Sequence, residues 1–271
     1  VVTIVGNPES ILQAAFLSIQ TASKFIDMRK HNGAHSRMGA TDVCPFVPIS
    51  NVTMDDCIKY SNQLAKKVGK ELNIPVFLYE YSATKKNMQN LAEIRKGEFE
   101  GMEKKLKLSK WKPNYGPLAP HKTAGVTAIG ARNFLIAYNI NLNTNDKRIA
   151  TDIALDIREQ GRNKRNNVGK FIRDKNGVPI KIPGTLKFCK AVGWYIKEYG
   201  LAQVSMNLTN INETSIHEAF EETRKQARKR GVRVTGSELV GLIPLQSLIS
   251  AGKYYLQEHK RSTGIPINDI I

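Results

Sequence analysis

The residue types best suited to chemistry lie in a glycine-containing loop at residues 31–48. This loop carries two histidines, one of them His35, together with Arg37 and Asp42, and it runs into the apolar segment 43–47. An imidazole exchanges protons near neutral pH, and a carboxylate a few residues away can orient it or hold a cationic substrate group. The loop is therefore the first candidate for a reaction site, with His35 as the group that moves a proton.

Plainer interpretations of this loop stay open. A loop histidine is more often a surface residue or a hydrogen-bond donor to the backbone, and Asp42 can pin the loop by accepting backbone amides. A metal site built from His31 and His35 is disfavoured, because Gly33 weakens the helix that would align them and no third ligand is evident in the sequence. We expect no metal cofactor.

A second candidate is the segment 121–133, which is rich in small residues. Gly125 and Gly130 would let a ligand approach the backbone closely, and Arg132 offers a planar fork suited to a carboxylate. The alternative is a glycine-containing hairpin in which Arg132 is merely exposed. A phosphate-binding loop is disfavoured, because no Gly-Lys-Ser or Gly-Lys-Thr ending follows and the order is strand to strand.

Polar residues in expected strands form a third group of candidates. Glu238 lies in the segment 236–244. Two further expected strands carry side-chain amides, at Asn139, Asn141 and Asn207. These side chains could bind a polar heterocycle, or they could form the solvated face of a sheet. Spacing alone does not decide between the two interpretations.

Composition narrows the partners and the compartment. The 271 residues carry a net charge of +17, from 41 Lys and Arg against 24 Asp and Glu, which suits nucleic acid, a membrane surface or a polyanionic small molecule. Nucleic acid is disfavoured, because two tryptophans do not make the repeated aromatic and basic surface of a single-strand binder. No apolar stretch approaches the ~18 residues of a membrane span, and three scattered cysteines indicate reduced thiols, so we expect a cytoplasmic protein with no membrane partner.

Hydrophobic periodicity predicts alternating helices and strands that position these residues. In the first half we expect helices at 8–27, 53–71, 87–96 and 146–160, with strands at 1–5, 43–47, 75–81, 125–130 and 134–142. In the second half we expect strands at 188–196, 201–207 and 232–240, with helices at 215–229 and 245–257. The strand at 1–5 looks as if it is entered partway, so we expect an upstream piece.

The polar, basic and turn-rich stretch 161–184 is the expected domain boundary. We therefore expect two subdomains, residues 1–165 and residues 166–271. Mixed strands with helices on one face predict an α+β fold of two ferredoxin-like subdomains. In this arrangement the β-sheets face one another, the helices lie outside, and a ligand groove lies between the sheets.

Three long segments, taken together, resemble the glutamate formimidoyltransferase family, whose members are also called glutamate formiminotransferases. They are residues 35–48, residues 123–133 and residues 236–244, the last reading Gly-Ser-Glu-Leu-Val-Gly-Leu-Ile-Pro. The resemblance covers nearly the whole chain, in order. It implies a two-subdomain α/β fold with facing sheets and a folate tunnel, in agreement with the groove expected above.

The resemblance implies transfer of the formimino group from N-formimino-L-glutamate to tetrahydrofolate, the co-substrate, in histidine degradation. The products are 5-formiminotetrahydrofolate and glutamate. His35 matches the family's catalytic histidine, and one near-neutral imidazole can take the proton from the pterin nitrogen and return one to the departing glutamate. Asp42 becomes a candidate for holding the cationic amidine, and Arg37 and Arg132 become candidates for binding carboxylates of glutamate or folate.

Further expectations accompany this resemblance. The remaining substrate- and folate-binding candidates are Gly125, Gly130, Asn139, Asn207 and Glu238. The basic surface could guide the anionic polyglutamate tail of folate, and a homodimer is an open alternative to a monomer. Family members carry a Pro-Asn-Phe-Ser-Glu-Gly-Arg-like motif ahead of the segment that matches Val1, and the sequence given does not contain that motif. Two other functions stay open: formyl transfer from N-formylglutamate to tetrahydrofolate, and a non-catalytic relative that binds folate or nucleic acid.

Overall fold

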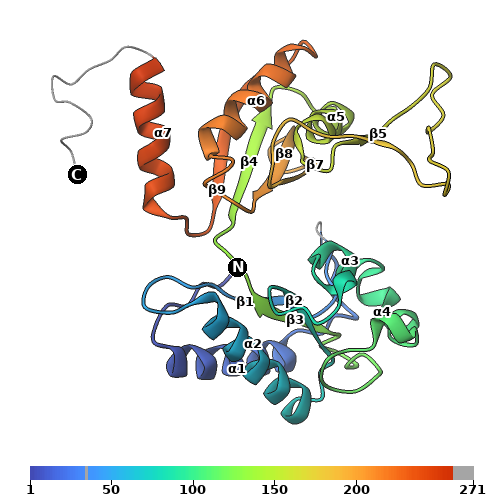
Figure 1. Ribbon diagram of the computed structural model, residues 1–271, viewed down its shortest axis with the longest axis vertical. Coiled ribbons are helices and arrows are strands. Elements are labelled where there is room, and N and C mark those ends of the chain that lie inside the picture. The colour runs from blue at the N-terminus through green and yellow to red at the C-terminus, as the bar shows by residue number, and fades with distance from the viewer. Residues whose placement is uncertain (34–35, 259–271) are drawn as a thin grey trace. The chain divides into compact units, whose positions relative to one another are not determined.

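The computed structural model describes residues 1–33 and 36–258 (Figure 1). Contacts divide the chain into two compact units, an N-terminal unit of residues 2–133 and a C-terminal unit that starts at residue 134. The division lies at 133/134 rather than at the expected 165/166, because the strand at 136–142 pairs with strands of the second half. The predicted facing of two sheets, and the groove between them, stay predictions.

The N-terminal unit contains a three-stranded parallel sheet. Its strands are β1 (Val43–Phe46), β2 (Val76–Glu80) and β3 (Thr127–Ala131), in the order β1-β3-β2. Residue 128 of β3 pairs with Val43 on one side and with Phe77 on the other. Helices connect the strands, as parallel pairing requires. The ferredoxin-like order expected for this half is therefore not found in its described part.

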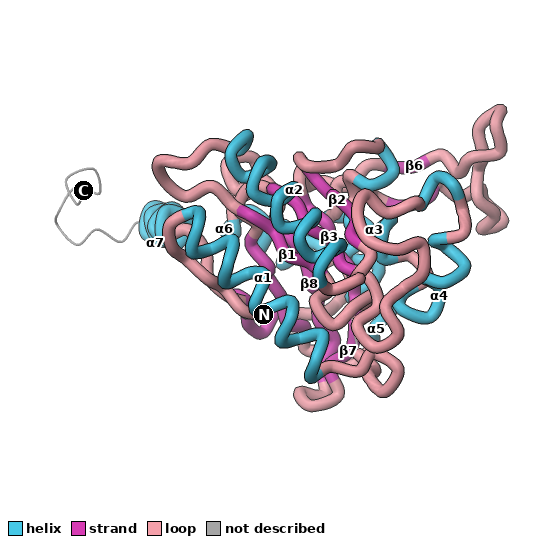
Figure 2. The backbone as a smooth tube through the Cα atoms, turned by 90° about the horizontal axis from the view of Figure 1, so that it is seen from below, coloured by secondary structure: helices cyan, strands magenta, loops and turns pink. Residues whose placement is uncertain are grey.

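Helices cover both faces of this parallel sheet. On one face lie α1 (Pro8–Phe25) and α2 (Met54–Glu71), which pack on Val76 and Leu78 (Figure 2). Against the other face, which presents Phe77 and Tyr79, pack four short elements. They are η1 (Lys86–Met88), α3 (Leu91–Arg95), α4 (Glu98–Leu106) and η2 (Ser109–Trp111). The expectation of helices on one face only is wrong for this unit, and the two-sided burial explains the continuous apolar run of β2.

Local capping signals fix the ends of the first helices. Asn7 accepts the amide of Ser10 and Pro8 begins α1, while Thr53 and Asp56 form a capping box at α2. Both helices therefore begin where their cap residues predict. Residues 1–5, in contrast, form no strand and are exposed. A strand needs a hydrogen-bonded neighbour, and no described residue pairs with this segment.

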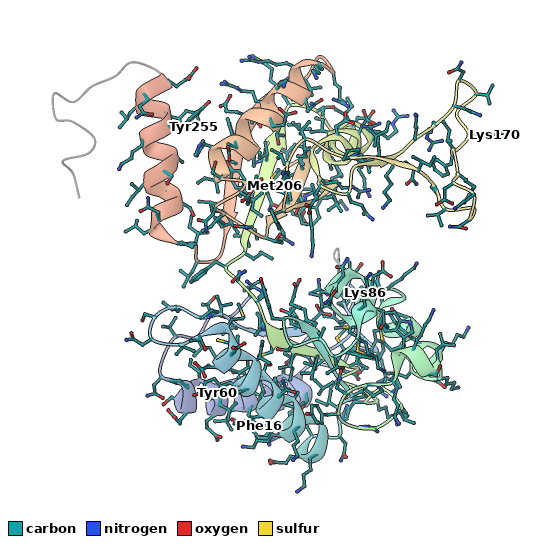
Figure 3. All side chains as sticks on the ribbon, viewed as in Figure 1. Phe16, Tyr60, Lys86, Lys170, Met206 and Tyr255 are labelled. Carbon is teal, nitrogen blue, oxygen red and sulfur yellow. The ribbon has the colours of Figure 1, made fainter. Side chains whose placement is uncertain are left out.

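The C-terminal unit is ferredoxin-like, as predicted. Its elements follow the order β-α-β-β-α-β: β4 (Ile136–Leu142), α5 (Lys147–Ile157), β7 (Cys189–Ile196), β8 (Leu201–Leu208), α6 (Ile216–Arg228) and β9 (Val234–Val240). The sheet is antiparallel in the order β7-β8-β4-β9. Its core lies between one face of the sheet and the helices α5 and α6, and Met206 of β8 belongs to it (Figure 3). Helix α7 (Leu245–Glu258) follows β9 and contacts α6.

A narrow arm extends from this unit between α5 and β7. Its base is the short pair β5 (Arg162–Asn163) and β6 (Lys181–Ile182), and Lys170 lies in its outer part (Figure 3). The arm consists of two consecutive eight-residue segments of the same pattern, here called octads, at 165–172 and 173–180. In each octad the first residue, an arginine, donates to a glycine carbonyl four residues on, at 2.6 Å and 2.7 Å.

Candidate functional site

Asp42 is held by its own chain at the amino end of β1. Its Oδ1 accepts the backbone N–H of Met38 at 2.8 Å, and its other oxygen pairs with the guanidinium of Arg95 from α3. The side chains of Asp42 and Arg95 are only 22% and 28% exposed. Both carboxylate oxygens are thus engaged within the chain, which favours the interpretation that Asp42 pins the loop.

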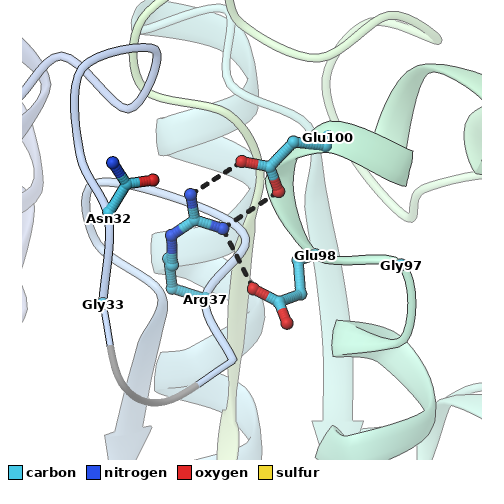
Figure 4. Close-up of a pocket in the computed structure, with 6 residues that line it drawn as sticks. All are labelled: Asn32, Gly33, Arg37, Gly97, Glu98 and Glu100. Carbon is cyan, nitrogen blue, oxygen red and sulfur yellow. Dashed lines mark hydrogen bonds and ion pairs between the residues drawn. The ribbon is translucent and has the colours of Figure 1, made fainter.

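Arg37 is also engaged within the chain (Figure 4). Its guanidinium donates to Glu100 at 2.7 Å, to Glu98 at 3.0 Å and to the carbonyl oxygen of His31 at 2.8 Å. The hydrogen bonds from Arg37 lower the pKa of Glu100 to about 2, and those to Glu100 raise the pKa of Arg37. A substrate carboxylate would have to compete with two carboxylates that already occupy this guanidinium.

A shallow cavity of about 450 Å³ lies beside this cluster. Its lining comes from the loop before β1 and from the start of α4: Asn32, Gly33, Arg37, Gly97, Glu98 and Glu100 (Figure 4). Both carboxylates are partly exposed, so the cavity presents hydrogen-bond acceptors to solvent. Such a site suits a ligand that brings a cationic or hydrogen-bond-donating group.

His35 lies outside the described residues. The structure therefore describes the two flanks of the loop, up to Gly33 and from Ser36 onward. The proton-transfer role of His35 stays a prediction from the sequence. What the structure adds is that Arg37, two residues along the chain, is fixed by three partners.

Three residues of this cluster were not anticipated: Arg95, Glu98 and Glu100. The sequence predicts a helix at 87–96 and an irregular excursion from 97 onward, whereas α4 begins at Glu98. A helix start was signalled by two acidic residues after Gly97, since acidic side chains favour the first turn of a helix. Their pairing with Arg37 spans 61 and 63 residues and has no local signal.

Gly125 and Gly130 are explained by packing of the chain on itself. A Cβ at Gly125 would lie 2.3 Å from the carbonyl oxygen of Met38, and a Cβ at Gly130 would lie 2.3 Å from that of Tyr79. Gly125 also has a φ of +69°, which favours glycine. Backbone therefore occupies the space that we expected a ligand to use.

Arg132 and the loop before β1 lie at opposite ends of the parallel sheet. Arg132 follows the last residue of β3, and its backbone N–H donates to Phe46 at the end of β1, whereas Asp42 precedes β1. Four strand residues separate the two ends, or about 13 Å. The guanidinium of Arg132 donates to the carbonyl of Asn133 at 2.8 Å, so the structure does not gather it with Arg37 and Asp42. The hairpin alternative is wrong, because β3 and β4 belong to different sheets.

The polar strand residues of the C-terminal unit share the sheet face opposite its helices. Asn139 and Asn141 alternate along β4 with the core residues Ile140 and Leu142. Both amides donate to Glu238 of β9, at 3.5 Å and 3.4 Å. This face therefore carries a connected set of amide and carboxylate groups.

Gln203 of β8 completes this network and was not among the predicted residues. It is 1% exposed, donates to Asn141 at 2.6 Å and to Glu238 at 3.1 Å, and accepts the indole N–H of Trp194 at 2.6 Å. Asn207 lies on the same face by register and is exposed. The polar alternation of Gln203, Ser205 and Asn207 with core residues was the signal that could have identified Gln203.

Comparison with known proteins shows the family to which the chain belongs. A model of the "Formiminotransferase domain, N-terminal subdomain" matches residues 1–132, and a model of the "Formiminotransferase domain" matches residues 137–270. The protein named Glutamate formimidoyltransferase from Streptococcus pyogenes serotype M1 is 47% identical over 257 residues, which cover 95% of this chain and 79% of that protein. The chain belongs to the formiminotransferase family.

Other formiminotransferase relatives differ in length. The Glutamate formimidoyltransferase of Thermoplasma acidophilum is 41% identical and is covered over 78% of its length. The Formimidoyltransferase-cyclodeaminase of Dictyostelium discoideum is 46% identical, but the chain spans only 44% of it. The two formiminotransferase matches meet between residues 132 and 137, close to the division of the structure at 133/134.

Among the helices that the structure describes, none is both long and apolar enough to cross a membrane. Within residues 1–33 and 36–258, no group of three or more His, Cys, Asp and Glu side chains could hold a metal ion.

Proposed function

We propose that this chain transfers the formimino group from N-formimino-L-glutamate to tetrahydrofolate, giving 5-formiminotetrahydrofolate and glutamate. The observation that carries this proposal is 47% identity, through both subdomains, to a relative named Glutamate formimidoyltransferase. Tetrahydrofolate is then a co-substrate, and the reaction belongs to histidine degradation in the cytoplasm. A polyglutamate tail on the folate would favour binding to a chain of net charge +17.

In the proposed reaction His35 moves the proton. The lone pair of the pterin nitrogen attacks the amidine carbon, and that nitrogen gives its proton to the imidazole of His35. The tetrahedral intermediate then breaks its bond to the glutamate nitrogen, which takes the proton from the imidazolium. A group with a pKa near neutrality can serve as base and then as acid.

The described residues suggest different roles for the other candidates. The ion pairs of Arg37 and Asp42 favour a role in holding the loop that carries His35. Asn139, Asn207 and Glu238 share a polar sheet face, which supports a role in binding a heterocycle such as a pterin. Arg132 is proposed to bind a carboxylate of folate or glutamate.

Tetrahydrofolate-dependent release of glutamate from N-formimino-L-glutamate tests the proposal directly. His35→Ala should lower kcat by at least about 100-fold, the size typical of a lost acid–base group, with an unchanged unfolding midpoint. His31→Ala is the matched control and should retain activity. Turnover of N-formylglutamate instead would indicate formyl transfer, and folate or nucleic-acid binding without turnover of either donor would indicate a non-catalytic relative. Sedimentation velocity would separate monomer from homodimer.

A further inference from the structure

The segment from α3 to α4 contacts the loop before β1 through ion pairs and a backbone hydrogen bond. Arg95 pairs with Asp42, and Glu98 and Glu100 pair with Arg37. The backbone adds a further contact, since the N–H of Phe99 donates to the carbonyl of Arg37 at 2.9 Å. Whatever fixes the segment 93–100 therefore also fixes residues 37–42.

A single buried ammonium group fixes that segment. The Nζ atom of Lys105 donates to the backbone carbonyls of Glu93 at 2.6 Å, Ile94 at 2.6 Å and Lys96 at 2.9 Å. It also lies 4.0 Å from the centroid of the Trp111 ring, which favours a cation. These carbonyls lie at the end of α3, where a helix lacks internal partners and favours positive charge. Lys105 is only 8% exposed.

The charged ammonium of Lys105 is kept at a buried position although its burial costs free energy. Burial lowers the pKa of Lys105 to about 8 from its ordinary value of 10.5, and nearby Lys96 and Lys110 act in the same direction. Glu93 is the acidic group that opposes this shift. A core position that needed only volume would be filled by an apolar side chain at lower cost.

The turn held by Lys105 is also conformationally demanding. Gly97 and Glu98 both adopt left-handed backbone, with φ of 97° and 54°. A non-glycine residue keeps such a conformation when its surroundings over-determine it. The carbonyl of Lys96, directly before this turn, accepts one of the three hydrogen bonds from Lys105, and the carboxylate of Glu98 is anchored on Arg37.

We propose that Lys105 is a positioning residue for the reaction, which holds the α3–α4 segment so that Arg95 and the two glutamates fix residues 37–42, the stretch that follows His35 in the sequence. This inference rests on the proposed function for its effect on turnover. Its structural part does not, because the contacts between the segment and the loop can be measured without a substrate. Loss of the ammonium leaves three carbonyls without their shared donor and frees the segment that aligns Arg37 and Asp42.

Lys105→Met, Lys105→Arg and the control Lys104→Met separate these contributions. Lys104 lies beside Lys105 on α4 and is exposed. Lys105→Met should speed hydrogen exchange at the amides of Met38 and Phe99 at least about tenfold. It should also lower kcat about 10- to 100-fold, the effect of a small misplacement of catalytic groups, with KM changed less than about threefold. Lys105→Arg keeps the charge, so its hydrogen-exchange rates and its kcat should lie close to those of the wild type. The control Lys104→Met should match the wild type in both quantities.

Unchanged exchange in Lys105→Met would overturn the inference, and so would faster exchange with unchanged kcat. If the wild type shows no turnover, the proposed function fails while the exchange experiment still decides the structural part. If Lys105→Met does not fold, Lys105→Gln takes its place, because its amide removes the charge but keeps a hydrogen-bond donor, one atom closer to the backbone. Slower turnover with the exchange pattern of the wild type would also count against positioning.

Discussion

Arg95 of α3 pairs with Asp42, and the same carboxylate accepts the backbone N–H of Met38. The side chain of Asp42 therefore joins α3 to both ends of a tight turn before β1. This relationship changes the role expected for Asp42. A carboxylate with a guanidinium on one oxygen and a buried amide on the other is satisfied without a ligand. Its main contribution is to the shape of the loop.

Substitution of Asp42 should therefore lower the stability of the fold more than it weakens substrate binding. Asp42→Asn can still accept the Met38 amide and should lower the free energy of unfolding by about 1 kcal/mol, whereas Asp42→Ala should lower it by about 2–3 kcal/mol. Urea unfolding of both variants tests this order. A tenfold rise in KM for Asp42→Asn with unchanged stability would instead assign Asp42 to the substrate.

The carboxyl group of Glu100 should titrate far below its ordinary range. Hydrogen bonds from Arg37 lower its pKa to about 2 from 4.5, so the ion pair stabilises the fold above pH about 4.5 and is lost as the pH falls toward 2. Arg37→Met should move this pKa back toward 4.5, and Lys104→Met should leave it in place. Carbon-detected NMR titration of the Glu100 carboxyl measures it; the same pKa in the wild type and Arg37→Met would show that Arg37 is not the cause.

Gly130 should tolerate no side chain, although it lies in a regular strand. The Cβ of Gly130→Ala would meet the Tyr79 carbonyl oxygen at 2.3 Å, and we expect a loss of about 2–3 kcal/mol in unfolding free energy. Gly101 in α4 is the matched control, because no atom outside the backbone of its own helix lies within 4 Å of its Cβ position. Gly101→Ala should be neutral or stabilising by up to about 1 kcal/mol. Equal effects of the two substitutions in thermal unfolding would argue against the packing explanation.

Gln203 should be the most sensitive member of the polar sheet face. Gln203→Leu removes the acceptor of the Trp194 indole and the donor to Asn141 and Glu238, which should cost about 2–3 kcal/mol. Asn207→Ala, at an exposed position of the same strand, should change stability by less than about 0.5 kcal/mol. Urea unfolding followed by tryptophan fluorescence compares them. A Gln203→Leu variant as stable as Asn207→Ala would mean that the network contributes little.

Elements with local signals could be predicted from the sequence, and elements with distant partners could not. Helices α1, α2 and α6 begin at the cap residues Asn7, Thr53 and Ser215, because a cap bonds within three residues of itself. The parallel pairing of β1 with β3 joins residues more than 80 positions apart, as in Val43 with Ala128. Periodicity says which face of a strand is apolar but not which strand lies beside it.

In the candidate site, too, the residue types could be predicted from the sequence but their distant partners could not. Asn139 and Glu238 were candidates as polar residues of two expected strands, and they do lie within hydrogen-bonding distance of each other. Arg37 was expected to hold a substrate carboxylate because its guanidinium suits one. The structure provides carboxylates from Glu98 and Glu100, which no spacing rule connects to Arg37. A charged residue's type predicts the chemistry of its partner, but the fold supplies the partner.

The two octads of the arm close on one shared ring of backbone hydrogen bonds. Positions 164, 172 and 180 bond to one another through their backbones, with Lys164 donating to Ile180, Ile172 to Lys164, and Ile180 to Ile172. Each octad thus returns the chain to an equivalent point before the next begins. Deletion of either octad would remove position 172 or position 180 and so break this closed ring of three hydrogen bonds. The exposed turns at Gly169 and Gly177 take no part in this ring and offer a site for grafting a peptide or label.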